Sequence, residues 1–155
     1  MMKNLLFLSY LVWCSSICSI AQTTKNAPDP VKWSFSYELV KGNTYRLIME
    51  AQLVDDWYIY PQILPANTAT PTFIAFDENS NVTVDSITTE IGELKEVFEK
   101  EYNVNIGKYY HTLRLETLAI VPHPNTTISG EIVYMSCSTV ACIRPQPLKF
   151  QFLIK

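Results

Sequence analysis

The stretch that decides the fold is residues 31–53, which read VKWSFSYELVKGNTYRLIMEAQL. Aromatic or aliphatic residues occupy every second position of residues 33–39, and polar residues lie between them. The same alternation returns in residues 45–51, after the turn pair Gly42-Asn43. A period of two is that of a half-buried strand. Two such runs joined by a short turn predict an antiparallel hairpin.

Short apolar runs continue along the chain and are separated by proline, asparagine and aspartate. They occupy residues 57–60, 72–76, 82–87, 109–121, 128–135 and 148–154. About seven or eight strands at this spacing, without a sustained helical repeat, predict an all-β sandwich or barrel. Segment 88–101 is the exception, since its apolar residues Ile91, Leu94, Val97 and Phe98 have helical spacing. We expect a short helix there, or a charged loop between strands.

The composition limits the size of the protein and its partners. A chain of 155 residues with 48% hydrophobic residues is long enough for one domain with its own core. Twelve Lys and Arg against fifteen Asp and Glu give a net charge of −3, so we expect no nucleic-acid partner. With two histidines and four glycines, neither a His-rich metal site nor a glycine-cradled phosphate site is expected. We therefore expect no cofactor.

The N-terminus has the pattern of a secretory signal peptide. Lys3 precedes an apolar run over residues 5–13, and small residues at Ser19 and Ala21 suit a signal peptidase. We therefore expect a signal peptide at residues 1–21, a flexible lead-in at residues 22–30 and one domain at residues 31–155. No later segment reaches the roughly 18 consecutive apolar residues of a membrane span, so we expect a soluble exported protein. Its compartment would permit disulfides.

Two of the four cysteines, Cys14 and Cys18, lie inside the expected signal peptide, which leaves Cys137 and Cys142. In the string CSTVAC, between two apolar runs, the two cysteines can face each other across a tight turn, so a bridge is geometrically possible. A purely structural bridge in so small a loop would contribute only about 2 kcal/mol. The other interpretation is a reversible redox pair, and spacing alone does not separate the two. A zinc site would need His111 and His123 as further ligands.

Three segments resemble a known family. They are the cysteine hairpin at residues 137–145, the aromatic run at residues 57–60, and residues 102–108 with the strand that follows. Together they are similar to the N-terminal periplasmic domain of the transmembrane thiol-disulfide reductase DsbD. They are also similar to its single-domain relatives, the disulfide bond corrector proteins. The resemblance extends from about residue 31 to residue 154. It implies an immunoglobulin-like β-sandwich of about seven to nine strands, with a cap loop over the cysteine hairpin.

The resemblance also implies a function and a set of site residues. It implies a periplasmic electron carrier, a thiol-disulfide oxidoreductase that relays reducing equivalents to or from a thioredoxin-like partner. Cys142 would attack the partner and Cys137 would resolve the mixed disulfide. The residues that would shield this pair or bind the partner are Tyr58, Tyr60, Tyr102, Ile106 and Pro145.

The family's membrane and C-terminal thioredoxin-like domains have no counterpart in this sequence. A separate membrane electron donor is therefore a second candidate partner, and we expect a monomer. The alternative is an exported immunoglobulin-like binding or assembly module, in which the disulfide is only structural.

Overall fold

The computed structural model describes residues 29–79, 81–144 and 146–155. This part of the chain contains eleven strands and no helix. The strands are β1 (Val31–Lys41), β2 (Thr44–Leu53), β3 (Tyr58–Ile59), β4 (Phe73–Phe76), β5 (Thr83–Val84), β6 (Thr89–Glu99), β7 (Val104–Ile120), β8 (Thr126–Val133), β9 (Ser136–Cys137), β10 (Cys142–Ile143) and β11 (Leu148–Ile154). Four of them, β3, β5, β9 and β10, are two residues long.

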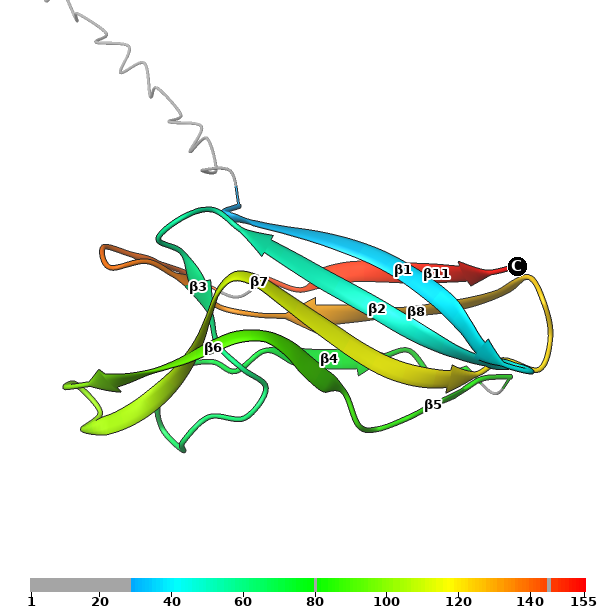
Figure 1. Ribbon diagram of the computed structural model, residues 1–155, viewed down its shortest axis with the longest axis horizontal. Helices are drawn as coiled ribbons and strands as arrows, with labels where there is room; N and C mark the ends of the chain where they lie inside the picture. The colour runs from blue at the N-terminus through cyan, green and yellow to red at the C-terminus, as the bar shows by residue number, and fades with distance from the viewer. Residues whose placement is uncertain (1–28, 80, 145) are drawn as a thin grey trace, which may run out of the picture.

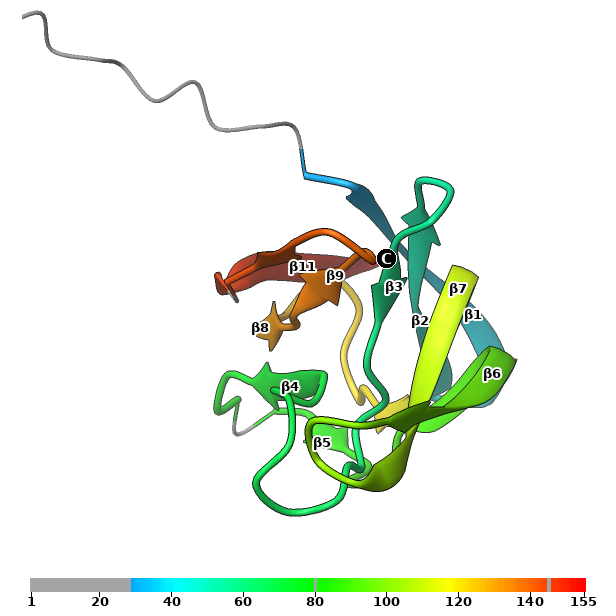
Figure 2. The same ribbon diagram turned by 90° about the vertical axis from the view of Figure 1, so that its left-hand side faces the viewer.

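The strands form two sheets that pack face to face (Figures 1 and 2). The larger sheet has eight strands in the order β1-β2-β7-β3-β9-β10, with β5 and β6 also paired to β7. The smaller sheet has the order β11-β8-β4. The predicted all-β, immunoglobulin-like sandwich is therefore confirmed. The two-residue strands explain why the structure has more strands than the predicted seven to nine.

The hairpin predicted from residues 31–53 is present as β1 and β2. The two strands pair antiparallel, with Phe35 opposite Met49 and Tyr37 opposite Leu47, and Gly42 turns the chain with a positive φ of 59°. Glycine adopts this left-handed conformation without the steric penalty of a Cβ atom. The local sequence therefore specifies both the register and the turn.

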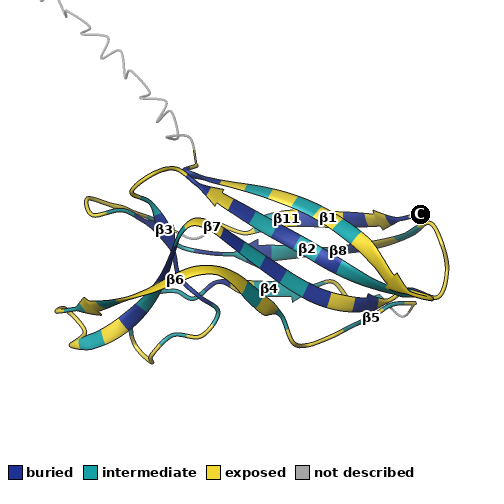
Figure 3. Cartoon of the chain, viewed as in Figure 1, coloured by how far each residue is buried: buried dark blue, intermediate teal, exposed yellow. Residues whose placement is uncertain are grey.

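The core lies between the two sheets, and burial alternates along the longer strands β2, β7, β8 and β11 (Figure 3). From the larger sheet, Leu47 and Met49 of β2 and Leu115 of β7 are fully buried. Phe150 of β11 covers them from the smaller sheet and stacks on Phe35, with ring centroids 5.5 Å apart. Gly130 on β8 lies opposite Phe150 and leaves room for its ring. A continuous apolar layer of this kind supplies most of the folding free energy.

The prediction of a helix or a charged loop at residues 88–101 is wrong. This segment is mostly strand β6, which pairs antiparallel with β7 and shifts register between Gly92 and Leu94. At this shift, residues 110–112 of β7 lie opposite the single residue Glu93, so the bulge is on β7. Strand β6 itself is largely exposed, so its sequence lacks a clean alternation of buried and exposed positions. On β7 the matching irregularity is His111, whose φ of 62° is in the left-handed region. Beyond it, β6 and β7 extend past the sandwich as a two-stranded arm (Figure 1).

Several expectations concern segments at the ends of the domain. The signal peptide at residues 1–21 and residues 22–28 of the lead-in lie outside the described residues. The boundary at residue 31 coincides with the start of β1, and the domain at residues 31–155 stays a prediction. Within the described ranges, no helix has the length and hydrophobicity needed to cross a membrane.

Candidate functional site

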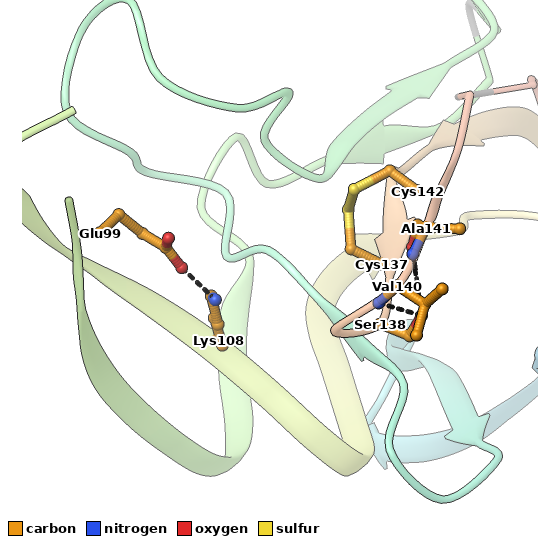
Figure 4. The surroundings of a disulfide bond; sticks show 7 residues. All are labelled: Glu99, Lys108, Cys137, Ser138, Val140, Ala141 and Cys142. Carbon is orange, nitrogen blue, oxygen red and sulfur yellow. Dashed lines mark hydrogen bonds and ion pairs between the residues drawn. A yellow bond between two sulfur atoms is a disulfide. The ribbon is translucent and has the colours of Figure 1, made fainter. Parts of the chain in front are cut away.

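The two cysteines lie on the short β9–β10 hairpin, where Cys137 and Cys142 are directly opposite each other. Their Cα atoms are 4.0 Å apart and their sulfurs form a disulfide (Figure 4). The Ser138 amide donates a hydrogen bond to the Ala141 carbonyl at 2.8 Å. The cysteines are therefore the next, non-hydrogen-bonded pair of the ladder, in which facing side chains approach most closely. The turn geometry thus brings the two sulfurs together.

Ser138 holds the turn between the cysteines. Its Oγ accepts hydrogen bonds from the amides of Val140 and Ala141, each at 3.2 Å. A serine side chain that bonds the backbone two or three residues ahead is a local turn-forming device. The turn is therefore kept by bonds that do not involve the disulfide.

The two cysteines differ sharply in burial. Cys137 is 0% exposed, because β9 lies between β3 and β10, with Tyr58 opposite Cys137 on the β3 side. Cys142 lies on β10, the last strand of the sheet order, and is exposed. A disulfide with one accessible sulfur can be attacked by a visiting thiolate from one side only.

Cys142 opens into a groove of about 250 Å³. Three of the predicted site residues, Tyr58, Tyr60 and Tyr102, line this groove together with Cys142. Its other lining residues are Thr68, Ala69, Thr70, Glu99, Glu101 and Met135. Four separate segments therefore meet around one sulfur: β3, the loop after it, the β6–β7 turn and the β8–β9 connection.

Tyr58 of β3 and Tyr60, directly after this strand, form one wall of the groove. The rings of Tyr58 and Tyr60 meet edge to face with centroids 5.5 Å apart, and Tyr58 also contacts Tyr110 at 5.4 Å. Burial, reinforced by the contact with Tyr58, raises the pKa of Tyr60 above its ordinary value. The Tyr60 phenol is therefore neutral at physiological pH and adds no negative charge next to a Cys142 thiolate.

The predicted cap over the cysteines is a β-hairpin and not an irregular loop. Residues 104–108 are the first part of β7 and pair with β6 on one side. Ile106 is 0% exposed and belongs to the same buried cluster as Cys137, Tyr58 and Tyr60. Tyr102, in the turn of this hairpin, is 39% exposed. The name cap hairpin is used below for residues 89–110.

An ion pair on the cap hairpin is a feature that the sequence did not reveal. Lys108 is only 5% exposed and forms an ion pair with Glu99 (Figure 4). Its Nζ also lies 4.1 Å from the centroid of the Tyr58 ring. Burial by itself would lower the pKa of Lys108, but the bonds to Glu99 and Tyr58 outweigh it and the pKa is raised. Lys108 is therefore a cation at physiological pH, and it contacts Tyr58 and Glu99, which line the groove. The spacing of Ile106, Lys108 and Tyr110 at every second residue was the available signal that these three side chains share one face of a strand.

The remaining sequence candidates lie elsewhere. Pro145 is outside the described residues. His111 is exposed and lies 4.0 Å from Asp55, and His123 lies in the turn before β8. Within the described part of the chain, no three His, Cys, Asp or Glu side chains are grouped so that they could hold a metal ion.

These features define a class of protein: an all-β, immunoglobulin-like domain with a half-accessible disulfide at a sheet edge, inside a tyrosine-lined groove. The family described as thiol:disulfide interchange protein DsbD, N-terminal, matches residues 25–154. The chain belongs to this family, as its cysteine hairpin and aromatic segment suggest. No curated protein sequence matches it.

Two solved structures are similar in fold. The N-terminal periplasmic domain of ScsB from Proteus mirabilis has a TM-score of 0.56 at 12% identity, over 80% of this chain and 46% of that one. The N-terminal domain of Neisseria meningitidis DsbD in the reduced form has a TM-score of 0.50 at 12% identity, over 78% of this chain and 90% of that one. The chain thus spans less than half of the ScsB structure and most of the DsbD domain.

Proposed function

We propose that this protein exchanges disulfides with a thioredoxin-like partner through reversible opening and closing of the Cys137–Cys142 bond. The observation that carries the proposal is the unequal burial of the two sulfurs in a member of the DsbD N-terminal family. A staple needs neither an accessible sulfur nor a groove around it. An exchange site needs both, because the attacking and leaving sulfurs must lie in line with the sulfur that is attacked.

The reduced protein would act in two steps. The Cys142 thiolate attacks one sulfur of the partner's disulfide, which forms a Cys142–partner disulfide and releases the partner's other sulfur as a thiolate. The Cys137 thiolate then attacks Cys142 Sγ, closes the Cys137–Cys142 bond and expels the partner's first sulfur as a thiolate. Two electrons pass from this chain to the partner, and the reverse sequence returns them. Cys137 is suited to the second step because its sulfur already faces Cys142 across the hairpin.

Domains of this family interact with thiol-disulfide partners, and the ScsB relative is described as periplasmic. These findings support an exported location for this chain. Removal of a signal peptide after Ala21 is part of the same proposal. A separate membrane protein as electron donor extends the same proposal. The groove of about 250 Å³ can admit the neighbourhood of one partner cysteine, not a whole domain. We therefore propose docking of the partner's active-site rim over the groove.

The test uses two matched single-cysteine variants, Cys137→Ala and Cys142→Ala. Each is mixed with a thioredoxin variant that keeps only its exposed cysteine, activated as a mixed disulfide with thionitrobenzoate. Cys137→Ala, which keeps Cys142, is expected to form a stable mixed disulfide at least about tenfold faster than Cys142→Ala. Equal rates for the two variants would contradict the assigned roles.

The reduction potential separates exchange from the alternative of a structural disulfide. An exchange pair should equilibrate between about −270 and −180 mV, the range of thioredoxin-fold oxidoreductases. A value well below about −300 mV, typical of inert secreted disulfides, would refute the proposed function. The binding-module alternative further predicts that a Cys137→Ser, Cys142→Ser double variant retains full binding function.

A further inference from the structure

Lys108 is the one charged side chain that is buried within the described ranges of the chain. It lies on β7 between Ile106 and Tyr110, on the face that packs against the cluster around Cys137. Taking an ammonium group out of water is costly, and an apolar residue of similar size packs at least as well in such a place. The packing of the cap hairpin alone therefore does not explain why a cation, and not an apolar residue, occupies this position.

The contacts of the ammonium group give a reason. It joins the Glu99 carboxylate at the end of β6 to the ring of Tyr58 on β3. Tyr58 in turn lies opposite Cys137 and lines the groove of Cys142. One cation thus connects the outer strand of the cap hairpin to the strand next to the cysteines.

At its outer end, the cap hairpin meets the cysteine region through a small set of contacts, of which the packing of Ile106 is the other main one. The outer strand β6 is largely exposed, and β3 pairs with the arm of β7 over only two residue pairs, Tyr58 with Tyr110 and Ile59 with Tyr109. The loss of one buried ion pair and one cation–π contact would therefore loosen both the hairpin and the tyrosine wall.

We propose that Lys108 is a positioning residue for exchange at Cys142: by holding Glu99 and Tyr58 it fixes the cap hairpin against the groove and limits the access of small reagents to the sulfur. This inference rests on the proposed exchange function and deepens it. An exposed dithiol in an oxidising compartment is open to every small oxidant, so controlled access favours reaction with the proper partner.

The test is the alkylation of the reduced protein by iodoacetamide, a small neutral reagent, followed by mass spectrometry over about pH 6 to 10, where thiols ionise. The plateau rate at high pH no longer depends on the thiolate fraction, because all of the thiol is then thiolate, so it reports access together with the intrinsic nucleophilicity of the thiolate. We expect Lys108→Met to raise this plateau roughly threefold to thirtyfold, the range that one cation–π contact can shift an equilibrium. Lys108→Arg, which keeps the cation, should restore a rate close to that of the wild type.

Two further variants complete the design. Glu99→Gln, at a side chain that is 30% exposed, removes one partner of Lys108 and should raise the plateau in the same direction even if Lys108→Met fails to fold. Lys95→Met is the matched control, because Lys95 lies on the same hairpin over Tyr110 at 5.4 Å but is 48% exposed. It should leave the plateau unchanged.

An unchanged plateau in Glu99→Gln and Lys108→Met, with a lower melting temperature, would overturn the inference and leave Lys108 a purely structural role. A rise in Lys108→Met that Lys108→Arg fails to reverse would overturn it as well, since lost packing would then be the cause. Failure of the wild type to exchange with thioredoxin disulfide would instead refute the proposed function, whatever the alkylation rates.

Discussion

Reduction of the Cys137–Cys142 bond should leave the domain folded and only modestly less stable. The bond joins residues five apart in sequence, so it closes a very small loop. The chain-entropy relation assigns such a loop about 2 kcal/mol of stabilisation. The main core between the sheets contains neither cysteine, and the turn keeps the hydrogen bonds of Ser138. For a domain of this size we expect the melting temperature to fall by roughly 5 to 10 °C.

The assay compares thermal unfolding of the oxidised and reduced forms, with the Cys137→Ala, Cys142→Ala double variant as a control that the reductant should not affect. The same free energy must appear in the reduction potential. A disulfide that stabilises the folded state by about 2 kcal/mol makes the folded pair about 40 mV more reducing than the same pair in the denatured chain. Unfolding on reduction, or a loss above about 4 kcal/mol, would refute the reasoning, because the bond would then be a structural support of the fold.

Three further predictions test the fold and the site. Ile106→Ala should lower the free energy of unfolding by about 2 to 4 kcal/mol, because Ile106 is fully buried beside Cys137. It should also speed alkylation of Cys142. Urea unfolding measures the first effect and the alkylation assay the second, and a loss of stability below about 1 kcal/mol would contradict the packing. Gly130→Ala should disrupt the smaller sheet, because a Cβ atom there would lie 2.2 Å from the Ala75 carbonyl oxygen and 2.7 Å from the Phe150 ring; an unchanged melting temperature would contradict the close approach of β4 and β8. Burial, and to a lesser extent the Glu90 carboxylate, raise the pKa of Tyr109 from 10.0 to about 12. The contribution of the neutral Tyr109 phenol to the free energy of unfolding is therefore complete below pH 10 and is lost as the pH rises toward 12. Tyr109→Phe should flatten the loss of stability over this interval in urea unfolding, and an unchanged slope would count against the burial of this phenol.

The sequence predicts the parts of the fold that are set by local alternation. Strands β1, β2, β7, β8 and β11 were found because one face of each is buried and the other is not. The sequence does not predict strand β6, because this strand is held by pairing with β7 and has no continuous buried face of its own. Pairing with a neighbouring strand overrides local preference, and the pattern of a single sequence does not show it.

In the site, too, the features set by local sequence could be predicted and those set by contacts between strands could not. The cysteine hairpin and the tyrosines could be found because they lie in short, recognisable segments. The ion pair of Lys108 with Glu99, and the contact of Lys108 with Tyr58, depend on β3 lying beside β7 in a particular register. Arg144, two residues beyond Cys142, shows the limit of local reasoning. On a strand it would share the face of Cys142 and favour the thiolate, but it lines a separate small hollow with Asp29 and Tyr134.

The different roles proposed for the two cysteines follow from their places in the sheet. Strand β9 has a neighbour on each side, so the sulfur of Cys137 is enclosed by β3 and β10. Strand β10 pairs on one side only, so Cys142 faces the groove. An incoming sulfur must approach along the axis of the bond that it breaks, and such a path exists only toward Cys142. Substitutions in the turn at residues 138–141 should therefore change the rate of exchange without changing which sulfur reacts, because the turn leaves the order of the strands intact.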